Sequence, residues 1–153
     1  MRVAIIGQGY VGLTIAMSAA QAGHEVLGFD LNPSLVAQLN TGHSHIEGVD
    51  GSVLKNLIAE NKYTSTFDSA ALDGSEVLVI AVPTPLDEER KPDLSYVHAA
   101  VDLINHNVRT PALIINESTS YPGTLRNEIA ARITDVAHIF ASSPERVDPG
   151  NST

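Results

Sequence analysis

Cysteine is absent from this chain of 153 residues. Without cysteine the chain cannot form a disulfide framework. A chain of this length can instead bury about 70% of the surface that it exposes when unfolded, which is enough for one ordinary hydrophobic core. The sequence therefore predicts a single domain over residues 1–153.

Basic residues are also few. Nine Lys and Arg stand against eighteen Asp and Glu, which gives a formal net charge of −9. Such a surface repels nucleic acid and anionic membranes, so an anionic ligand must be held by local donors. No apolar run approaches the length that crosses a bilayer, and no signal peptide precedes the first predicted strand. We therefore expect a cytoplasmic protein that binds neither nucleic acid nor a membrane.

The most informative segment lies next to the N-terminus. A short apolar run at residues 3–6 is followed by Gly7, Gly9 and Gly12 in G-x-G-x-x-G spacing. In this pattern the first glycine allows a tight turn, the second lets a pyrophosphate approach the backbone, and the third lets a helix pack against the strand. The phosphates then lie on the N-terminus of that helix, so the segment predicts a dinucleotide site.

A second apolar run at residues 25–29 ends on Asp30, about twenty residues after the glycines. A carboxylate at this place accepts hydrogen bonds from the ribose hydroxyls of a dinucleotide. No Arg or Lys stands between Asp30 and Lys55 to neutralise a 2′-phosphate, which favours NAD over NADP. The alternative is that Asp30 is a capping or turn residue before Asn32 and Pro33.

Strands and helices alternate along the rest of the chain. Apolar runs predict strands at 76–82, 112–116 and 137–141, because short continuous apolar stretches are typical of buried parallel strands. A further short strand is expected at 63–67. Helical periodicity and capping residues predict helices at 33–40 after Asn32, from Asp50 through Ile58, after Asp93 with Val97, Val101 and Ile104 on its apolar face, and after 122–123 with Leu125, Ile129 and Ile133. This order predicts an α/β fold with a doubly wound parallel sheet of Rossmann type and three α/β/α layers.

Polar clusters follow the predicted strands directly. In such sheets ligands bind beyond the carboxyl ends of the strands, so we expect these clusters to border one crevice. They are residues 7–12, Asp30, residues 83–85, residues 117–119 and residues 143–146.

With these motifs placed, the chain resembles the nucleotide-sugar dehydrogenase family that includes UDP-glucose dehydrogenase. The likeness spans nearly the whole chain, and the later motifs are most similar to the branch acting on UDP-N-acetylglucosamine or UDP-N-acetylmannosamine. The motifs are GQGYVGL at 7–13, VPTP at 82–85, PDLSYV at 92–97, ESTSYPGT at 117–124 and SPERVDPG at 143–150.

The resemblance implies oxidation of the C6 alcohol of a UDP-sugar to a carboxylate with two molecules of NAD. That route passes through a thiohemiacetal and a thioester on an enzyme cysteine, which this chain lacks. In the family the cysteine lies in a later portion. We therefore expect the chain to be the NAD-binding domain without the central helix and the C-terminal sugar-nucleotide domain, inactive alone, and part of a homodimer when full length.

The resemblance also assigns roles near the reacting carbon. Thr119 would hydrogen-bond a water or a developing oxygen near C6, Glu145 would be the general base for attack on the thioester and would contact the substrate, and Arg146 would face the substrate. Burial of the Glu145 carboxylate would raise its pKa, whereas the neighbouring cation would oppose that rise. The alternative is that Glu145 and Arg146 form a solvated surface pair and Thr119 caps a helix.

Cofactor contacts carry over from the same likeness. Tyr10 and Val11 would offer backbone N–H groups to the pyrophosphate, Thr84 after Pro83 would contact the nicotinamide-side ribose or phosphate, and Thr119 would lie near the nicotinamide. One departure is Leu35, which stands where the family commonly has Lys or Arg. We expect it to reduce or rearrange binding of the adenosine side.

Other functions have weaker support. His43 and His45 lack a third residue with metal-ligand spacing, so no metal site is predicted. No serine lies in a nucleophile elbow, and no P-loop lysine is present. A stand-alone NAD-sensing module would explain the first motif equally well but not the later clusters. Other two-domain dehydrogenases, of the 6-phosphogluconate or 3-hydroxyacyl-CoA kind, share the first motif without the later ones.

Overall fold

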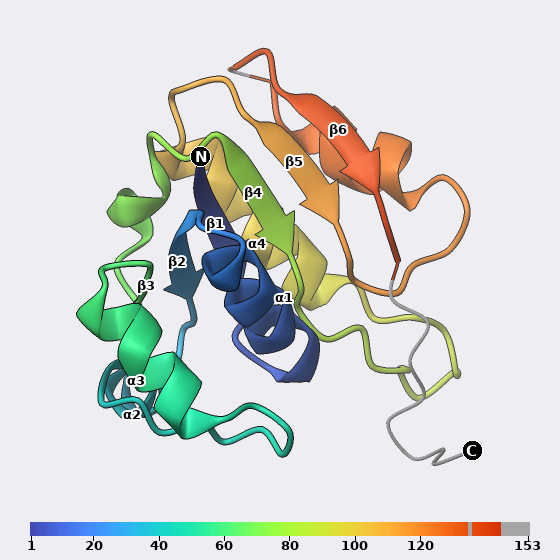
Figure 1. Cartoon of the computed structure of the whole chain (residues 1–153). Helices are drawn as coiled ribbons and strands as arrows, with labels where there is room; N and C mark the ends of the chain where they lie inside the picture. The colour runs from blue at the N-terminus through green and yellow to red at the C-terminus, as the bar shows by residue number, and fades with distance from the viewer. Residues whose placement is uncertain (135, 145–153) are drawn as a thin grey trace.

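The computed structural model describes residues 1–134 and 136–144. These residues form a six-stranded sheet in which all strands are parallel and lie in the order β3-β2-β1-β4-β5-β6 (Figure 1). This order is that of a doubly wound Rossmann-type sheet, which confirms the predicted fold. The strands are β1 (Arg2–Ile6), β2 (Glu25–Phe29), β3 (Tyr63–Thr66), β4 (Val77–Ile80), β5 (Leu113–Asn116) and β6 (Ile139–Ser142).

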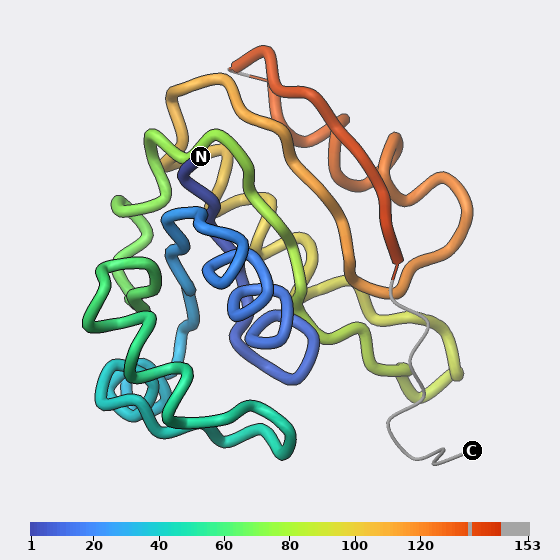
Figure 2. The backbone as a smooth tube through the Cα atoms, in the orientation of Figure 1, coloured from blue at the N-terminus to red at the C-terminus, as the bar shows by residue number. Residues whose placement is uncertain are grey.

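Helices cover both faces of the sheet. In Figures 1 and 2, α1 (Tyr10–Gln21) and α3 (Gly51–Ala59) lie in front of the sheet and α4 (Ser95–Asn107) lies behind it. A further helix, α2 (Pro33–Asn40), packs beside β3. Within the described residues no helix is both long and apolar enough to span a bilayer.

The central strands are buried on both sides, which explains their unbroken apolar runs. On β1, Val3 and Ile5 belong to the cluster under α1 and α3, whereas Ala4 and Ile6 belong to the cluster under α4. Successive side chains of a strand point to opposite faces, so one apolar run supplies both cores. Both cores support the ends of β1, β2, β4 and β5, where the polar loops begin.

Two predicted caps are present. Asn32 Oδ1 accepts hydrogen bonds from the N–H groups of Ser34 (3.1 Å) and Leu35 (3.3 Å), and Pro33 opens α2. Asp50 Oδ1 accepts from Ser52 N–H at 2.8 Å. The predicted cap at Asp93 is displaced by one position. Leu94 occupies the cap of α4, and the Asp93 carboxylate accepts the N–H of Ser95 at 2.9 Å from one residue earlier.

The predicted helix after residues 122–123 is not an α-helix. It consists of a π-helical turn, η2 (Leu125–Ile129), and a 3₁₀ turn, η3 (Ala130–Arg132). Ile129 and Ile133 are buried as the apolar spacing predicts. The spacing indicates which side chains face the core but not the hydrogen-bond pattern, because packing rather than propensity stabilises such short segments.

The last strand also begins later than the predicted residue 137. The ring Nδ1 of His138 accepts the N–H of Ala112 at 3.1 Å, and the regular ladder starts with Ile139 N–H donating to the Ala112 carbonyl at 3.0 Å. The His138 side chain thus accepts the Ala112 N–H in place of a backbone carbonyl of the last strand.

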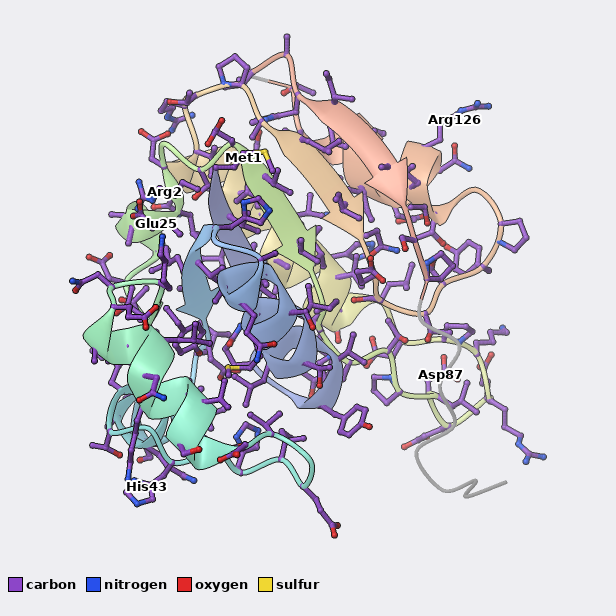
Figure 3. The ribbon with its side chains drawn as sticks, viewed as in Figure 1. Met1, Arg2, Glu25, His43, Asp87 and Arg126 are labelled. Carbon is purple, nitrogen blue, oxygen red and sulfur yellow. The ribbon has the colours of Figure 1, made fainter. Side chains whose placement is uncertain are left out.

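The amino ends and the carboxyl ends of the strands differ in their surroundings. At the amino ends, the Arg2 guanidinium donates to the carbonyl oxygens of Asp73 (2.9 Å) and Ala71 (2.8 Å) and lies near Glu25. Figure 3 shows Arg2 and Glu25 at the amino ends of the strands, and Asp87 in the loop after β4 at the carboxyl ends. The contacts of Arg2 therefore fill the amino ends of the strands, and the loops available for a ligand are those that follow the carboxyl ends.

The Asp73 carboxylate links the 3₁₀ turn η1 (Ser69–Leu72) to the segment before β5. Its Oδ1 accepts the N–H groups of Arg109 (2.8 Å) and Thr110 (3.1 Å), and these bonds hold the pKa of Asp73 below its ordinary value of 3.8. A carboxyl group whose pKa is lower in the folded than in the unfolded chain stabilises the fold at pH values above its ordinary pKa. This stabilisation is lost as the pH falls through the pKa of the folded state.

We expect Asp73→Asn to lose less stability on acidification than the wild-type chain, because asparagine keeps an acceptor oxygen but does not titrate. Urea unfolding followed by circular dichroism at about pH 6 and about pH 3 measures the difference. Equal losses in both proteins between the two pH values would contradict the prediction.

Candidate functional site

A cavity of about 520 Å³ lies at the carboxyl ends of the strands. Its walls come from the loops that follow β1, β2, β4 and β5, together with one side of α4. This volume is typical of a small-molecule or cofactor site. The sequence-predicted residues that border it are Gly7, Gly9, Tyr10, Val11, Asp30, Pro83, Thr84 and Thr119.

The loop after β1 turns tightly against β2 and β4. Gly7 has φ +94°, and its N–H donates to the Phe29 carbonyl at 2.8 Å. A Cβ at this position would lie 2.7 Å from the carbonyl oxygen of Ala81. Gly7 therefore has the conformation and the contacts that only glycine accommodates without strain.

The N-terminus of α1 faces the cavity. Gly9 is the cap residue, and a Cβ built on it would meet no described atom within 4 Å. Among the described residues no side chain caps this helix, and the N–H groups of Tyr10 and Val11 belong to its first turn, which has no intrahelical acceptors. Open space and unpaired donors fit the negative oxygens of a pyrophosphate.

The Asp30 carboxylate is held on both oxygens. Oδ2 accepts the backbone N–H of Gln8 at 2.9 Å, and Oδ1 accepts that of Asn32 at 2.9 Å. A carboxylate has about four lone-pair sites, so one remains on each oxygen for ribose hydroxyls. The alternative role of Asp30 as a turn residue agrees with its hydrogen bond to the N–H of Asn32. The cap of α2, however, is Asn32, and Asp30 also borders the cavity.

The opposite wall is built by the loops after β4 and β5. Ser118 is buried, and its hydroxyl donates to the Val82 carbonyl at 2.8 Å, while Glu117 N–H donates to the Ile80 carbonyl at 2.9 Å. Asn116, fully buried at the end of β5, donates through Nδ2 to the Ser118 carbonyl at 3.0 Å. These bonds tie the loops after β4 and β5 together, and Thr84 and Thr119 line the cavity from these loops.

Some cavity residues were not predicted from the sequence. Tyr96, Ala99 and Leu103 come from the side of α4 next to its buried face. Their positions follow from how α4 lies across the sheet, and the helical period alone gives no sign of it. Leu31 and Leu35 make the wall near Asp30 apolar, and Leu35 is the departure noted in the sequence.

Not every predicted site residue borders the cavity. Gly12 is buried beneath the first loop, where a Cβ would overlap the carbonyl oxygen of Gly7. Ser143 and Pro144 follow β6 but are not part of the cavity wall. Glu145 and Arg146 lie outside the described residues. Four of the five predicted clusters are therefore brought together.

Potential metal ligands do not gather in the part of the chain that the structure describes. Across residues 1–134 and 136–144, no group of three or more His, Asp or Glu side chains is placed to hold a metal ion. His43 instead contacts the hydroxyl of Thr41 through Nδ1 at 3.0 Å.

Comparisons with known proteins agree with this geometry. The family model described as "UDP-glucose/GDP-mannose dehydrogenase family, NAD binding domain" matches residues 1–153. The UDP-N-acetyl-D-mannosamine dehydrogenase of Pyrococcus horikoshii is 36% identical over 98% of the chain. The UDP-N-acetyl-D-glucosamine 6-dehydrogenase of Pseudomonas aeruginosa is 32% identical over 99%.

A solved structure supports the same relation. The GDP-mannose dehydrogenase of Pseudomonas aeruginosa, in a ternary complex, superposes with a TM-score of 0.91 and 29% identity over 97% of the chain. The chain covers 37% of that protein, and 37% and 36% of the two relatives above. It thus spans a little over a third of the length of the proteins that it matches.

Proposed function

The chain belongs to the UDP-glucose/GDP-mannose dehydrogenase family, as its NAD-binding domain, and on this premise we propose that it serves an enzyme oxidising the C6 alcohol of a UDP-N-acetylhexosamine to a carboxylate. The choice of sugar is supported by relatives whose names specify UDP-N-acetylmannosamine and UDP-N-acetylglucosamine. The remaining chemistry belongs to parts of the enzyme beyond residues 1–153.

The observation that carries the proposal is the order of the cavity walls across the sheet. Asp30 follows β2, the glycine loop follows β1, and Thr84 and Thr119 follow β4 and β5. A doubly wound sheet binds a dinucleotide at the point where the strand order reverses, here between β1 and β4. At this point Asp30 would hold the adenosine ribose of NAD, and Thr84 and Thr119 would lie on its nicotinamide side.

Each residue has a defined task in this arrangement. The N–H groups of Tyr10 and Val11 bind the pyrophosphate, and Asp30 accepts hydrogen bonds from the adenosine ribose. Bound NAD supplies the hydride acceptor. The Thr119 hydroxyl would donate to a water or to the oxygen that develops near C6. The family resemblance assigns two further roles to residues outside the described ones: Glu145 would take a proton from the water that releases the product, and Arg146 would bind the sugar nucleotide.

The division of labour within the enzyme is proposed from the family resemblance, which implies a cysteine nucleophile. The chain has no cysteine, so the nucleophile that holds the oxidised sugar comes from elsewhere in a longer protein. We place the chain as the NAD-binding domain of such a protein, which acts as a homodimer. The 153-residue chain by itself binds NAD and performs no turnover.

The longer protein that contains this chain tests the proposal. We expect it to form two molecules of NADH for each UDP-N-acetylglucosamine or UDP-N-acetylmannosamine consumed, whereas the 153-residue chain forms none. NADH absorbance with UDP-glucose in parallel measures the sugar preference. Equal rates with UDP-glucose would remove the N-acetylhexosamine assignment. Saturable NAD binding without NADH from any UDP-sugar would favour the NAD-sensing module instead.

A further inference from the structure

Gln8 lies between two glycines of the cavity loop, yet none of its surface is exposed. Its backbone N–H donates to Asp30 Oδ2 at 2.9 Å, and its side-chain Nε2 donates to the Ile5 carbonyl at 2.9 Å and to the Gly7 carbonyl at 3.2 Å. The residue thus contacts Asp30 through its backbone while its side chain anchors the loop to β1.

Tyr63 completes the anchor from the far side of β2. Its hydroxyl donates to Gln8 Oε1 at 2.9 Å, and only 2% of Tyr63 is exposed. A tyrosine hydroxyl is protonated at physiological pH, and burial raises the pKa of Tyr63 further, so its hydroxyl remains a donor. Tyr63 begins β3, and the two residues are separated by 55 positions.

The space for this contact is provided by Gly28 on β2. A Cβ on Gly28 would lie 2.5 Å from Gln8 Oε1 and 2.6 Å from the Tyr63 hydroxyl. Gly28 stands two positions before Asp30. Three strands therefore converge on one buried hydrogen bond next to the carboxylate.

We propose that Gln8 and Tyr63 are positioning residues that set the Asp30 carboxylate for the adenosine ribose of NAD. With Oε1 held by Tyr63 and Nε2 held by the Ile5 carbonyl, the Gln8 side chain cannot rotate, and its backbone N–H stays directed at Asp30 Oδ2. That bond and the Asn32 N–H bond each occupy one lone-pair site, which leaves one site on each oxygen for the ribose hydroxyls. The inference rests on the proposed contact between Asp30 and NAD.

The test is Tyr63→Phe in the 153-residue chain, titrated with NAD and with the NAD analogue that lacks the adenosine ribose 2′-hydroxyl. Phenylalanine keeps the packing and removes one hydrogen bond, so we expect NAD affinity to fall about three- to tenfold. The preference for NAD over the analogue should shrink toward that of Asp30→Ala. A merely structural role would lower both affinities in proportion and leave the preference unchanged.

Tyr121→Phe is the matched control. The Tyr121 hydroxyl donates to the Glu128 carboxylate at 3.3 Å, and neither residue borders the cavity. Loss of this hydroxyl should therefore leave the preference for NAD over the analogue unchanged. Gly28→Ala is the second variant, because it displaces the same contact without deleting a donor. We expect it to reduce the preference as Tyr63→Phe does.

The outcomes separate the inference from the function on which it rests. Wild-type preference in folded Tyr63→Phe and Gly28→Ala, with the preference lost in Asp30→Ala, would overturn the positioning role alone. No NAD binding by the folded wild-type chain, or an unchanged preference in Asp30→Ala, would overturn both the Asp30 contact and this inference.

Discussion

Asp30→Ala is expected to weaken NAD binding by roughly ten- to hundredfold, which corresponds to about 1.5–3 kcal/mol. The carboxylate is already fixed by Gln8 and Asn32 at 2.9 Å each. Its remaining lone pairs are therefore oriented before the ligand arrives, and alanine removes charged hydrogen bonds whose ordering cost the free chain has already met. Calorimetric titration of the folded chain with NAD measures the change.

The same titration with NADP tests the selectivity of Asp30. A 2′-phosphate would face this carboxylate, and no Arg or Lys lies between Asp30 and Lys55 in the sequence to compensate. We expect the wild-type chain to bind NAD much more tightly than NADP, and Asp30→Ala to reduce this difference between the two affinities. Asp30→Asn is the matched control, since it keeps the size of the side chain and removes its charge. Unchanged NAD affinity in Asp30→Ala would contradict the cofactor contact.

The fold and one half of the site could be predicted because their signals are local. The glycine spacing, the strand that ends on Asp30 and the cap at Asn32 are short motifs in which neighbouring residues determine the backbone. The sheet order follows from the alternation of strands and helices, because parallel strands require crossover connections. For these features the structure adds distances to what the pattern indicates.

The rest depends on contacts between segments that are distant in sequence. Nothing near Gln8 indicates that its side chain turns inward, because its partner Tyr63 lies on another strand and the space comes from Gly28 on a third. Tyr96 and Leu103 border the cavity because of the way α4 crosses the sheet. Periodicity shows which face of that helix is buried but not which ligand space its flank borders.

Hydrogen-bond patterns were predicted less well than burial for the same reason. Ile129 and Ile133 are buried as expected, although the backbone between them is π-helical and then 3₁₀. The start of β6 depends on the His138 ring, which takes the place of a backbone acceptor for Ala112. Side-chain competition for a backbone partner has no signature in hydropathy.

Gly12→Ala is expected to destabilise the fold by about 3 kcal/mol. The added Cβ would overlap the carbonyl oxygen of Gly7, which belongs to the backbone of the preceding loop. A change of side-chain rotamer cannot relieve such an overlap, so α1 must move away from β1. The neighbouring Leu13 and Ala16, both fully buried, would then lose part of their packing in the core under α1.

Gly9→Ala is the matched variant for this loop, because the same methyl group is added three positions earlier, where it would meet no described atom within 4 Å. Gly9 has φ −73°, which alanine adopts readily, so the stability cost should be the weaker helix cap of about 1 kcal/mol or less. The methyl group would instead occupy space at the open N-terminus of α1, and NAD affinity should fall while the fold is retained. Urea unfolding and NAD titration of both variants therefore separate the two glycines. Wild-type stability in Gly12→Ala would refute the packing argument, and wild-type NAD affinity in Gly9→Ala would show that the pyrophosphate does not approach this loop.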